Sequence, residues 1–202
     1  PLSGGLDSRL VLCKLKQLGY DRLHAFSYGP EGNDEARVAR EVAKRIEVPW
    51  LFVPGSVARS REFFYSEARR EYWDFADGMS VVPNMQDFHT LYSLRENRRI
   101  PADCVVINGQ SGDFITGGHI PGFLQREHAS VQLLVERIQE KHYSQWIHLK
   151  SSQNLDITSN KIKKLLQIKE DRLFNPQEMA VFFEQWEWQE RQSKYVVNGQ
   201  RA

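Results

Sequence analysis

The chain begins with Pro1-Leu2-Ser3-Gly4-Gly5-Leu6-Asp7-Ser8, the stretch around which we expect the fold to be organised. An apolar residue leads into a turn of small residues, and apolar residues at helical spacing follow directly after Asp7. This order predicts the end of a strand, a tight loop and the start of a helix. The first N–H groups of a helix lack intrahelical partners and carry partial positive charge. The loop is therefore predicted to bind an anion, with phosphate as the best candidate.

The residues of this loop suit that role in different ways. Gly4 and Gly5 let the backbone approach a ligand closely, and Ser3 and Ser8 add hydroxyl donors. The carboxylate of Asp7 would repel a phosphate unless a divalent metal lies between the two groups. The loop is thus predicted to hold both a phosphate and a metal.

The spacing and the lysine of a Walker loop are absent from this stretch. S-G-G-L-D-S instead resembles the PP-loop of the N-type ATP pyrophosphatases, which holds the pyrophosphate end of ATP while a substrate is adenylated. The alternative is a glycine turn that merely starts a helix. The strand-turn-helix context favours the PP-loop interpretation.

Strand and helix patterns alternate after the loop. The first helix is predicted to end near Gly19, and a strand, a helix and a second strand are predicted at Leu23–Tyr28, Asp34–Ile46 and Trp50–Val53. This alternation is typical of a parallel sheet with right-handed crossovers.

Two helices and a strand are predicted next, at Ser56–Phe75, Asn84–Asn97 and Cys104–Ile107. The strand is a continuous apolar run and leads into the polar loop Asn108–Asp113. Ligands of open parallel sheets gather beyond the carboxyl ends of the strands, so we expect this loop to lie near the first one.

The rest of the chain is predicted to be helical, at Val131–His142, Ser159–Leu173 and Pro176–Val196, with no further strand. The fold class is therefore α/β, with a parallel-sheet domain over residues 1–120 and an appended α-helical subdomain over residues 121–202. The resemblance to a PP-loop implies that the first of these is an adenine nucleotide α-hydrolase-like domain. Because the chain begins in the middle of the strand that precedes the motif, we expect it to be part of a longer protein. The first strand would then be truncated and the helical subdomain incomplete at its C-terminus.

The 202 residues carry a formal net charge of +1, which gives no indication of a nucleic-acid or membrane surface. Cys13 and Cys104 are the two cysteines, and we expect both to be reduced in a cytoplasmic protein. The sequence shows no signal peptide and no apolar run long enough to cross a bilayer.

Three segments, in order along the chain, resemble the synthetase domain of the asparagine synthetase family. They are S-G-G-L-D-S, L-H-A-F-S-Y-G and V-V-I-N-G-Q-S-G-D-F-I-T-G-G-H. The resemblance implies ATP and Mg²⁺ as cofactors, with Asp7 and Asp113 binding the metal, and it places Tyr28, Asn108 and Gly109 around adenine and ribose. The nucleotide-binding residues that it implies are Leu2, Ser3, Gly4, Gly5, Asp7, Ser8, Tyr28, Asn108 and Gly109.

The resemblance also implies a reaction. A small carboxylate substrate, aspartate or a sugar acid, would attack the α-phosphate of ATP, and ammonia or an amine would capture the resulting acyl-adenylate. The predicted catalytic residues are Asp7, Gln110 and Asp113. Ammonia would come from a glutaminase domain that precedes Pro1, and the family's catalytic lysine would lie beyond the present C-terminus.

Two positions depart from the family pattern S-G-E-G-x-D-E. Gln110 replaces the glutamate thought to assist the nucleophile, and an amide cannot accept a proton as a base. Phe114 replaces the acidic residue after the metal ligand. Adenylation remains the predicted half-reaction, while amide formation and aspartate as substrate are less well supported.

Rival interpretations stay open. One is another PP-loop amide ligase, such as a β-lactam synthetase-like or sugar-acid amidating enzyme, and another is a nucleotide-binding module without catalysis. A transfer-RNA-modifying enzyme is the third, but glutamates and aspartates alternate with the arginines of residues 59–70 and 95–99, which favours a solvated helix face. Arg9 could reach a phosphate or pair with local carboxylates, and the sequence leaves the oligomeric state open.

Overall fold

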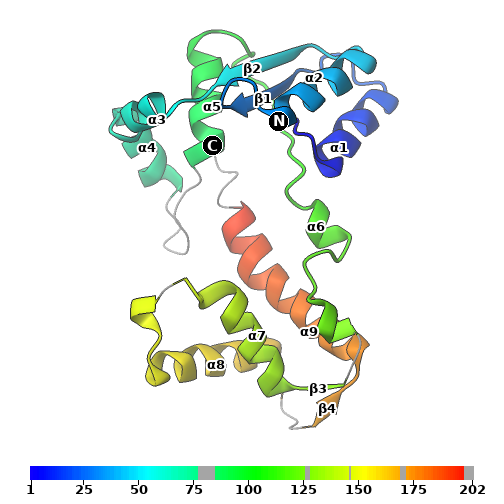
Figure 1. Cartoon of the computed structure of the whole chain (residues 1–202), viewed down its shortest axis with the longest axis vertical. Helices are drawn as coiled ribbons and strands as arrows, with labels where there is room; N and C mark the ends of the chain where they lie inside the picture. The colour runs from blue at the N-terminus through cyan, green and yellow to red at the C-terminus, as the bar shows by residue number, and fades with distance from the viewer. Residues whose placement is uncertain (77–84, 126–127, 146, 169–171, 198–202) are drawn as a thin grey trace. The chain divides into compact units, whose positions relative to one another are not determined.

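The structure is a computed structural model that describes residues 1–76, 85–125, 128–145, 147–168 and 172–197 (Figure 1). The chain divides into two compact units, Pro1–Asp113 and Phe114–Tyr195. The domain boundary expected from the sequence, between residues 120 and 121, stays a prediction.

A parallel pair of strands lies at the centre of the first unit. β1 (Ala25–Gly29) pairs with β2 (Trp50–Pro54) in register from Ala25 opposite Trp50 to Gly29 opposite Pro54. Leu2 N donates a hydrogen bond to Phe26 O (2.8 Å), so the segment before the first loop lies along β1. The crossover helix α2 (Asp34–Arg45) contacts both strands. The predicted strand-helix-strand order is confirmed.

Small side chains let α2 pack closely on the strands. Ala39 and Ala43 are fully buried, and they join a core with Leu2, Leu12 and Val48. Leu12 comes from α1 (Leu6–Gln17), which follows the first loop as expected. The core of this unit therefore fixes the first loop between α1 and β1.

The single helix predicted over Ser56–Phe75 is wrong, because the segment forms α3 (Val57–Phe64) and α4 (Glu67–Ala76). Ser66 explains the break: its Oγ accepts a hydrogen bond from Arg69 N (3.2 Å), as a residue that caps a helix start does. The next helix, α5 (Met85–Glu96), is confirmed, although its predicted first residue, Asn84, lies outside the described residues.

Packed aromatic rings join α3, α4 and α5. The Tyr72 and Phe88 ring centroids are 3.9 Å apart with nearly parallel planes, and Phe63 lies 5.8 Å from Phe88. Phe63 and Tyr72 are buried in this packing, whereas Phe64 and Phe75 are exposed.

The strand predicted at Cys104–Ile107 is not formed. Its Val105 is 84% exposed, and the backbone hydrogen bond from Cys104 N runs back to Pro101 O in a turn (3.4 Å). A run of β-branched residues makes a strand only where a neighbouring strand offers paired N–H and C=O groups. This segment continues through Asn108–Ser111 to the short helix α6 (Gly112–Ile115).

The second unit is helical. Its elements are η1 (Gly122–Gln125), β3 (Ala129–Ser130), α7 (Val131–Tyr143), η2 (Ile147–Leu149), α8 (Ser152–Leu166), β4 (Leu173–Phe174), α9 (Pro176–Trp186) and a π-helix η3 (Glu187–Val196). The two short strands pair antiparallel, so the expectation of no further strand is wrong. Trp186, Phe183, Leu134, Ile138 and Met179 lie at the centre of its core.

Helix α8 begins and ends earlier than predicted. Ser151 caps its start by accepting a hydrogen bond from Asn154 N (3.2 Å), and Gln167 ends it in a left-handed conformation (φ 55°). Helix α7 has the predicted bounds to within one residue, and the predicted last helix changes from α to π hydrogen bonding at Glu187.

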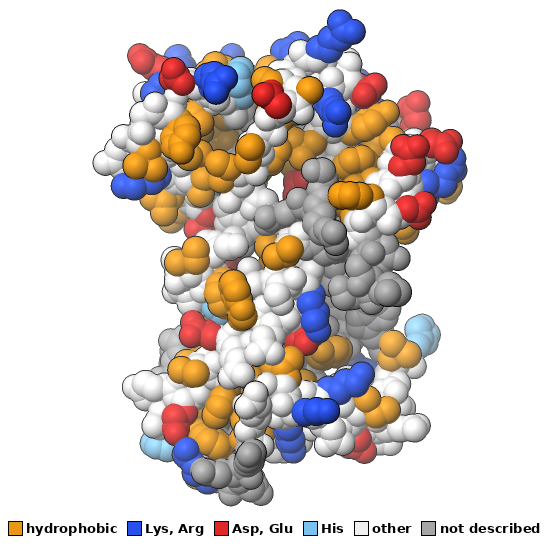
Figure 2. Space-filling view, turned by 180° about the vertical axis from the view of Figure 1, so that it is seen from behind, with side chains coloured by type: hydrophobic (Ala, Val, Ile, Leu, Met, Phe, Trp, Pro, Cys, Tyr) orange, Lys and Arg blue, Asp and Glu red, His pale blue; other side chains and the backbone are white. Residues whose placement is uncertain are grey.

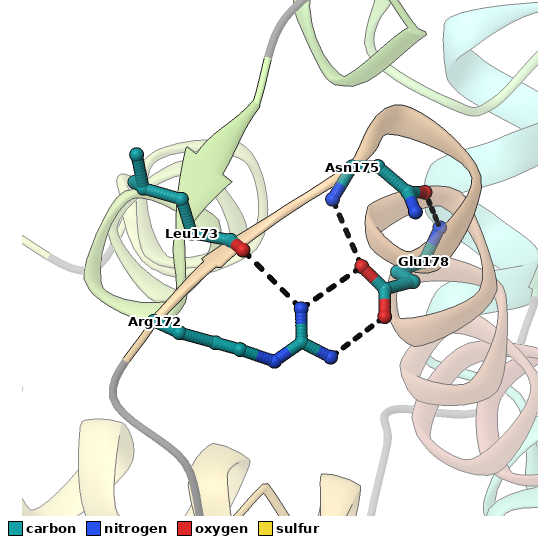
Figure 3. Close-up of polar contacts among 4 residues, drawn as sticks. All are labelled: Arg172, Leu173, Asn175 and Glu178. Atoms are coloured by element: carbon teal, nitrogen blue, oxygen red, sulfur yellow. Dashed lines mark hydrogen bonds and ion pairs between the residues drawn. The ribbon is translucent and has the colours of Figure 1, made fainter.

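A polar cluster joins β4 to α9 (Figure 3). Arg172 donates to both carboxylate oxygens of Glu178 (2.7 and 3.2 Å) and to Leu173 O. Asn175 and Glu178 form a capping box, each accepting a hydrogen bond from the other's backbone N–H. The hydrogen bond from Arg172, followed by that from the Asn175 backbone, lowers the pKa of Glu178 to about 2.

Candidate functional site

The first loop closes on itself through its two serines. Ser3 N donates to Ser8 Oγ (3.1 Å), the two hydroxyl groups are 3.1 Å apart, and Gly5 N donates to Ser3 Oγ (3.2 Å). Gly5 is the N-cap of α1 and has no side chain with which to cap it. The start of α1 therefore has no side-chain cap among the described residues, an arrangement that suits an anion.

Arg9 braces this loop from within the first unit. Its Nη2 donates to Gly4 O (3.0 Å), and its Nε is buried without a hydrogen-bond partner among the described residues. The sequence left open whether Arg9 contacts a phosphate or a carboxylate. In the structure its contact is with a loop carbonyl.

The second loop is a compact turn. Gly112 N donates to Gly109 O (3.0 Å), and Gln110 N donates to Asn108 Oδ1 (3.1 Å). The turn leads directly into α6, which has Asp113 in its first turn. These contacts fix the backbone on both sides of Gln110.

The two loops touch through glycines. A Cβ atom added to Gly109 would lie 2.8 Å from Ser8 N and 3.0 Å from the carbonyl carbon of Asp7. A Cβ atom on Gly112 would overlap the carboxyl group of Asp7. Glycine is needed at both positions for this close approach, and the expected proximity of the loops is observed.

The two loops line one cavity of about 480 Å³. Of the residues that the sequence assigned to the site, those lining the cavity are Leu2, Ser3, Gly5, Asp7, Ser8, Tyr28, Asn108, Gly109, Gln110 and Asp113. Gly4 does not line it and lies against α2, where its Cβ position is 3.5 Å from Glu35 Cα. The fold thus brings together nearly the whole predicted set.

Four carboxylates, those of Asp7, Glu35, Asp87 and Asp113, line this cavity. In the described part of the chain, no group of three or more His, Cys, Asp or Glu side chains could hold a metal ion. Asp7 and Asp113 still fit Mg²⁺, because this ion is usually bound by one or two carboxylates together with phosphate oxygens. Bound nucleotide would have to supply the remaining ligands.

Sequence reasoning missed two of these acids. Asp87 lies in the first turn of α5 and accepts a hydrogen bond from Tyr28 Oη (2.7 Å), and Glu35 lies in the first turn of α2. Burial, followed by this hydrogen bond, raises the pKa of Tyr28. The available signal was an acidic residue in the first turn of each helix, which by itself does not identify a cavity.

Phe114, at the second position that departs from the family pattern, packs within the second unit. Its ring centroid lies 5.0 Å from that of His119 and 5.7 Å from that of Trp188. The side chain therefore has a packing role there. Across the described residues, no helix has the length and apolar character needed to cross a membrane.

The chain was compared with known proteins. Comparison with curated proteins and with solved structures gives no match. The family model described as asparagine synthase matches residues 1–198. Since this match covers nearly the whole chain, the chain belongs to the asparagine synthase family, as a synthetase domain of that family.

Proposed function

We propose that the chain binds Mg²⁺ and ATP in the cavity of the first unit and uses them to activate a carboxylate for amide formation. The observation that carries this proposal is the meeting of the uncapped start of α1 with Asp7 and Asp113 in one cavity. Helix N–H groups suit phosphate, and the two carboxylates suit the accompanying metal. The activity of the family supports the same chemistry.

Each part of the cavity has a proposed role. Ser3, Gly5 and Ser8 contact the phosphates, Tyr28 with Asn108 and Gly109 borders adenine and ribose, and Asp7 and Asp113 hold Mg²⁺. When bound, Mg²⁺ neutralises the charge that develops on the leaving pyrophosphate. The remaining predicted contacts, Leu2 and Gly4, support the loop from the core and from α2.

In the first half-reaction, an oxygen of the substrate carboxylate forms a bond to the α-phosphorus while the bond from this phosphorus to the bridging oxygen breaks. Pyrophosphate leaves with the electron pair, and an acyl-adenylate remains. No protein group has to transfer a proton in this half-reaction, because the attacking carboxylate is already ionised. The protein contributes positioning and stabilisation of charge.

The second half-reaction is capture of the acyl group by ammonia or an amine: the C–N bond forms, the bond from the acyl carbon to the AMP oxygen breaks, and AMP and one proton are released to the solvent. Gln110 lines the cavity, and its amide can orient the nucleophile but cannot remove a proton from it. We therefore propose a nucleophile that arrives as a free base, such as ammonia from a glutaminase domain. The acid can be aspartate, or the substrate of a β-lactam-forming or sugar-acid amidating ligase.

A second candidate is a nucleotide-binding module without catalysis, which Gln110 favours. For either candidate we propose a cytoplasmic protein whose α/β domain spans residues 1–120 and whose helical subdomain spans residues 121–202. The two candidates differ in whether pyrophosphate is released.

The test follows exchange of labelled pyrophosphate into ATP in the presence of Mg²⁺ and a panel of acids, with ATP binding measured by calorimetry. We expect exchange with at least one acid and its loss in Asp113→Asn. Asp156→Asn is the control, because Asp156 is an exposed residue of α8 and does not line the cavity. ATP binding without exchange would support the non-catalytic module, and failure to bind ATP would reject both candidates.

A further inference from the structure

A second cavity of the first unit is lined by positive charge. It has a volume of about 1120 Å³ and lies at the carboxyl ends of β1 and β2, where Gly29, Pro30, Pro54 and Gly55 border it. Three arginines line it, Arg59, Arg61 and Arg99, and no Asp or Glu is among the described residues of its wall. Ligands of parallel sheets bind beyond this end of the strands.

Two of the three guanidinium groups of this cavity make no hydrogen bond and no ion pair with the described residues. Within the described chain, the side chains of Arg61 and Arg99 make no hydrogen bond and no ion pair. Other arginines of the unit do: Arg37 pairs with Asp34 (2.9 Å), and Arg70 pairs with Glu67 (3.5 Å). Arg61 and Arg99 are both exposed, so an anion that enters the cavity can pair with their guanidinium groups.

Arg59 is held in place at the carboxyl end of β2. Its Nη1 donates to Pro54 O (3.0 Å), and its charge, after burial, contributes to lowering the pKa of His89, which also lines the cavity. One arginine is thus positioned before any ligand arrives. A positioned donor binds an oxyanion with less loss of side-chain entropy than a mobile one.

The remaining wall has apolar and polar parts. Leu51, Val53 and Phe64 offer apolar surface, and Ser60 and Ser93 offer hydroxyl groups. The volume lies just above the range found for small-molecule sites, about 300–1,000 Å³. This combination fits a molecule with a carbon skeleton as well as charged groups.

We propose that this cavity binds a small organic anion that carries at least two carboxylate or phosphate groups. The proposal goes beyond the carboxylate activation described above and does not depend on it. Tyr28 borders both this cavity and the nucleotide cavity, so the anion would bind next to the nucleotide. A nucleic acid is the less favoured ligand, since on the face shown in Figure 2 Lys and Arg side chains are interspersed with Asp and Glu.

The test measures binding of citrate and of inorganic phosphate by calorimetry at low ionic strength, on the full chain. The test variant is Arg61→Gln/Arg99→Gln. The control is Arg40→Gln/Arg45→Gln, which removes the same charge from exposed positions of α2 that do not line the cavity. Thermal unfolding of each variant checks that it folds. The variant Arg61→Lys/Arg99→Lys, which keeps the charge and removes the guanidinium fork, replaces the test variant if that one does not fold.

We expect one of the two anions to bind the wild type and the control equally, and to bind the test variant at least about tenfold more weakly. Tighter binding of citrate would assign a carboxylate ligand, and tighter binding of phosphate a phosphorylated one. The lysine variant should bind several-fold more weakly than the wild type. The proposal is overturned if neither anion binds the wild type, if test and control variants weaken binding equally, or if a single-stranded RNA binds through these arginines while both small anions do not.

Discussion

Gly109→Ala should separate the two loops of the nucleotide cavity. The added Cβ atom would lie 2.8 Å from Ser8 N and 3.0 Å from the carbonyl carbon of Asp7. Atoms in favourable contact are about 3.5–4.0 Å apart, so one loop has to move by roughly half an ångström or more. Both contacts are with backbone atoms of α1, which cannot rotate away as the end of a side chain could. We expect the second loop, with Asp113, to be displaced.

The size of the effect follows from the cost of overpacking, typically about 1–3 kcal/mol. If this cost opposes the arrangement that binds nucleotide, the Kd for Mg²⁺-ATP rises about 5- to 140-fold, since about 1.4 kcal/mol is a factor of ten. Calorimetry measures the Kd, and urea unfolding measures stability in the absence of ligand. The weaker binding should persist under conditions where the variant is fully folded.

Gly122→Ala is the matched control, because its Cβ atom would meet no described atom within 4 Å beyond its two chain neighbours and its own helix backbone. It should bind Mg²⁺-ATP as the wild type does. The reasoning would be refuted by a Gly109→Ala variant with unchanged Kd and unchanged stability, since the loops would then not need their close contact. An equal loss in both variants would also contradict it.

Three further predictions concern ionisation and capping. Burial, and then the hydrogen bond to Asp87, raises the pKa of Tyr28. The contribution of the neutral Tyr28 to the free energy of unfolding is therefore fully present below about pH 10 and is lost as the pH rises further. Asp87→Asn should lower this pKa, which an ultraviolet titration measures. Burial, followed by the charges of nearby cations, lowers the pKa of His142 to about 3. The contribution of the neutral His142 to the free energy of unfolding is therefore fully present above about pH 6.5 and is lost as the pH falls toward 3. His142→Gln should reduce this acid sensitivity in urea unfolding. Asn175→Ala removes the acceptor of Glu178 N (3.0 Å) and should cost about 1 kcal/mol of unfolding free energy by urea titration, with no change expected if the cap is unimportant.

Local signals made the first part of the fold predictable. A glycine turn before a helical pattern predicted the start of α1, and α2 begins at the predicted residue, Asp34, where Asn33 Oδ1 accepts a hydrogen bond from Ala36 N (2.7 Å). Such signals depend on residues within one turn of each other, so the sequence contains them fully. The glycines of the second loop were also visible, although the atoms that they accommodate, those of Asp7 and Ser8, were not.

Predictions that required a distant partner failed. Cys104–Ile107 has the residues of a buried strand, yet pairing depends on a neighbour that no local pattern reveals. The prediction of one continuous helix over Ser56–Phe75 failed for a local reason. The hydroxyl group of Ser66 caps the start of α4 and interrupts an otherwise continuous helical pattern. Asp87 was missed because its role comes from Tyr28, far away in the sequence but 2.7 Å away in space.

The charges of the chain show why a total can mislead. A formal net charge of +1 gave no indication of a strongly charged surface, and the acidic residues that alternate with the arginines along the sequence favoured a solvated helix face. In the first unit the fold sorts these charges, with four carboxylates lining one cavity and three arginines lining the other, and Tyr28 bordering both. A cavity of carboxylates calls for a cation and a cavity of arginines for an anion, whatever the sum of the two. Net charge therefore bounds long-range attraction, while the chemistry of a site is decided by which side chains the fold brings to one wall.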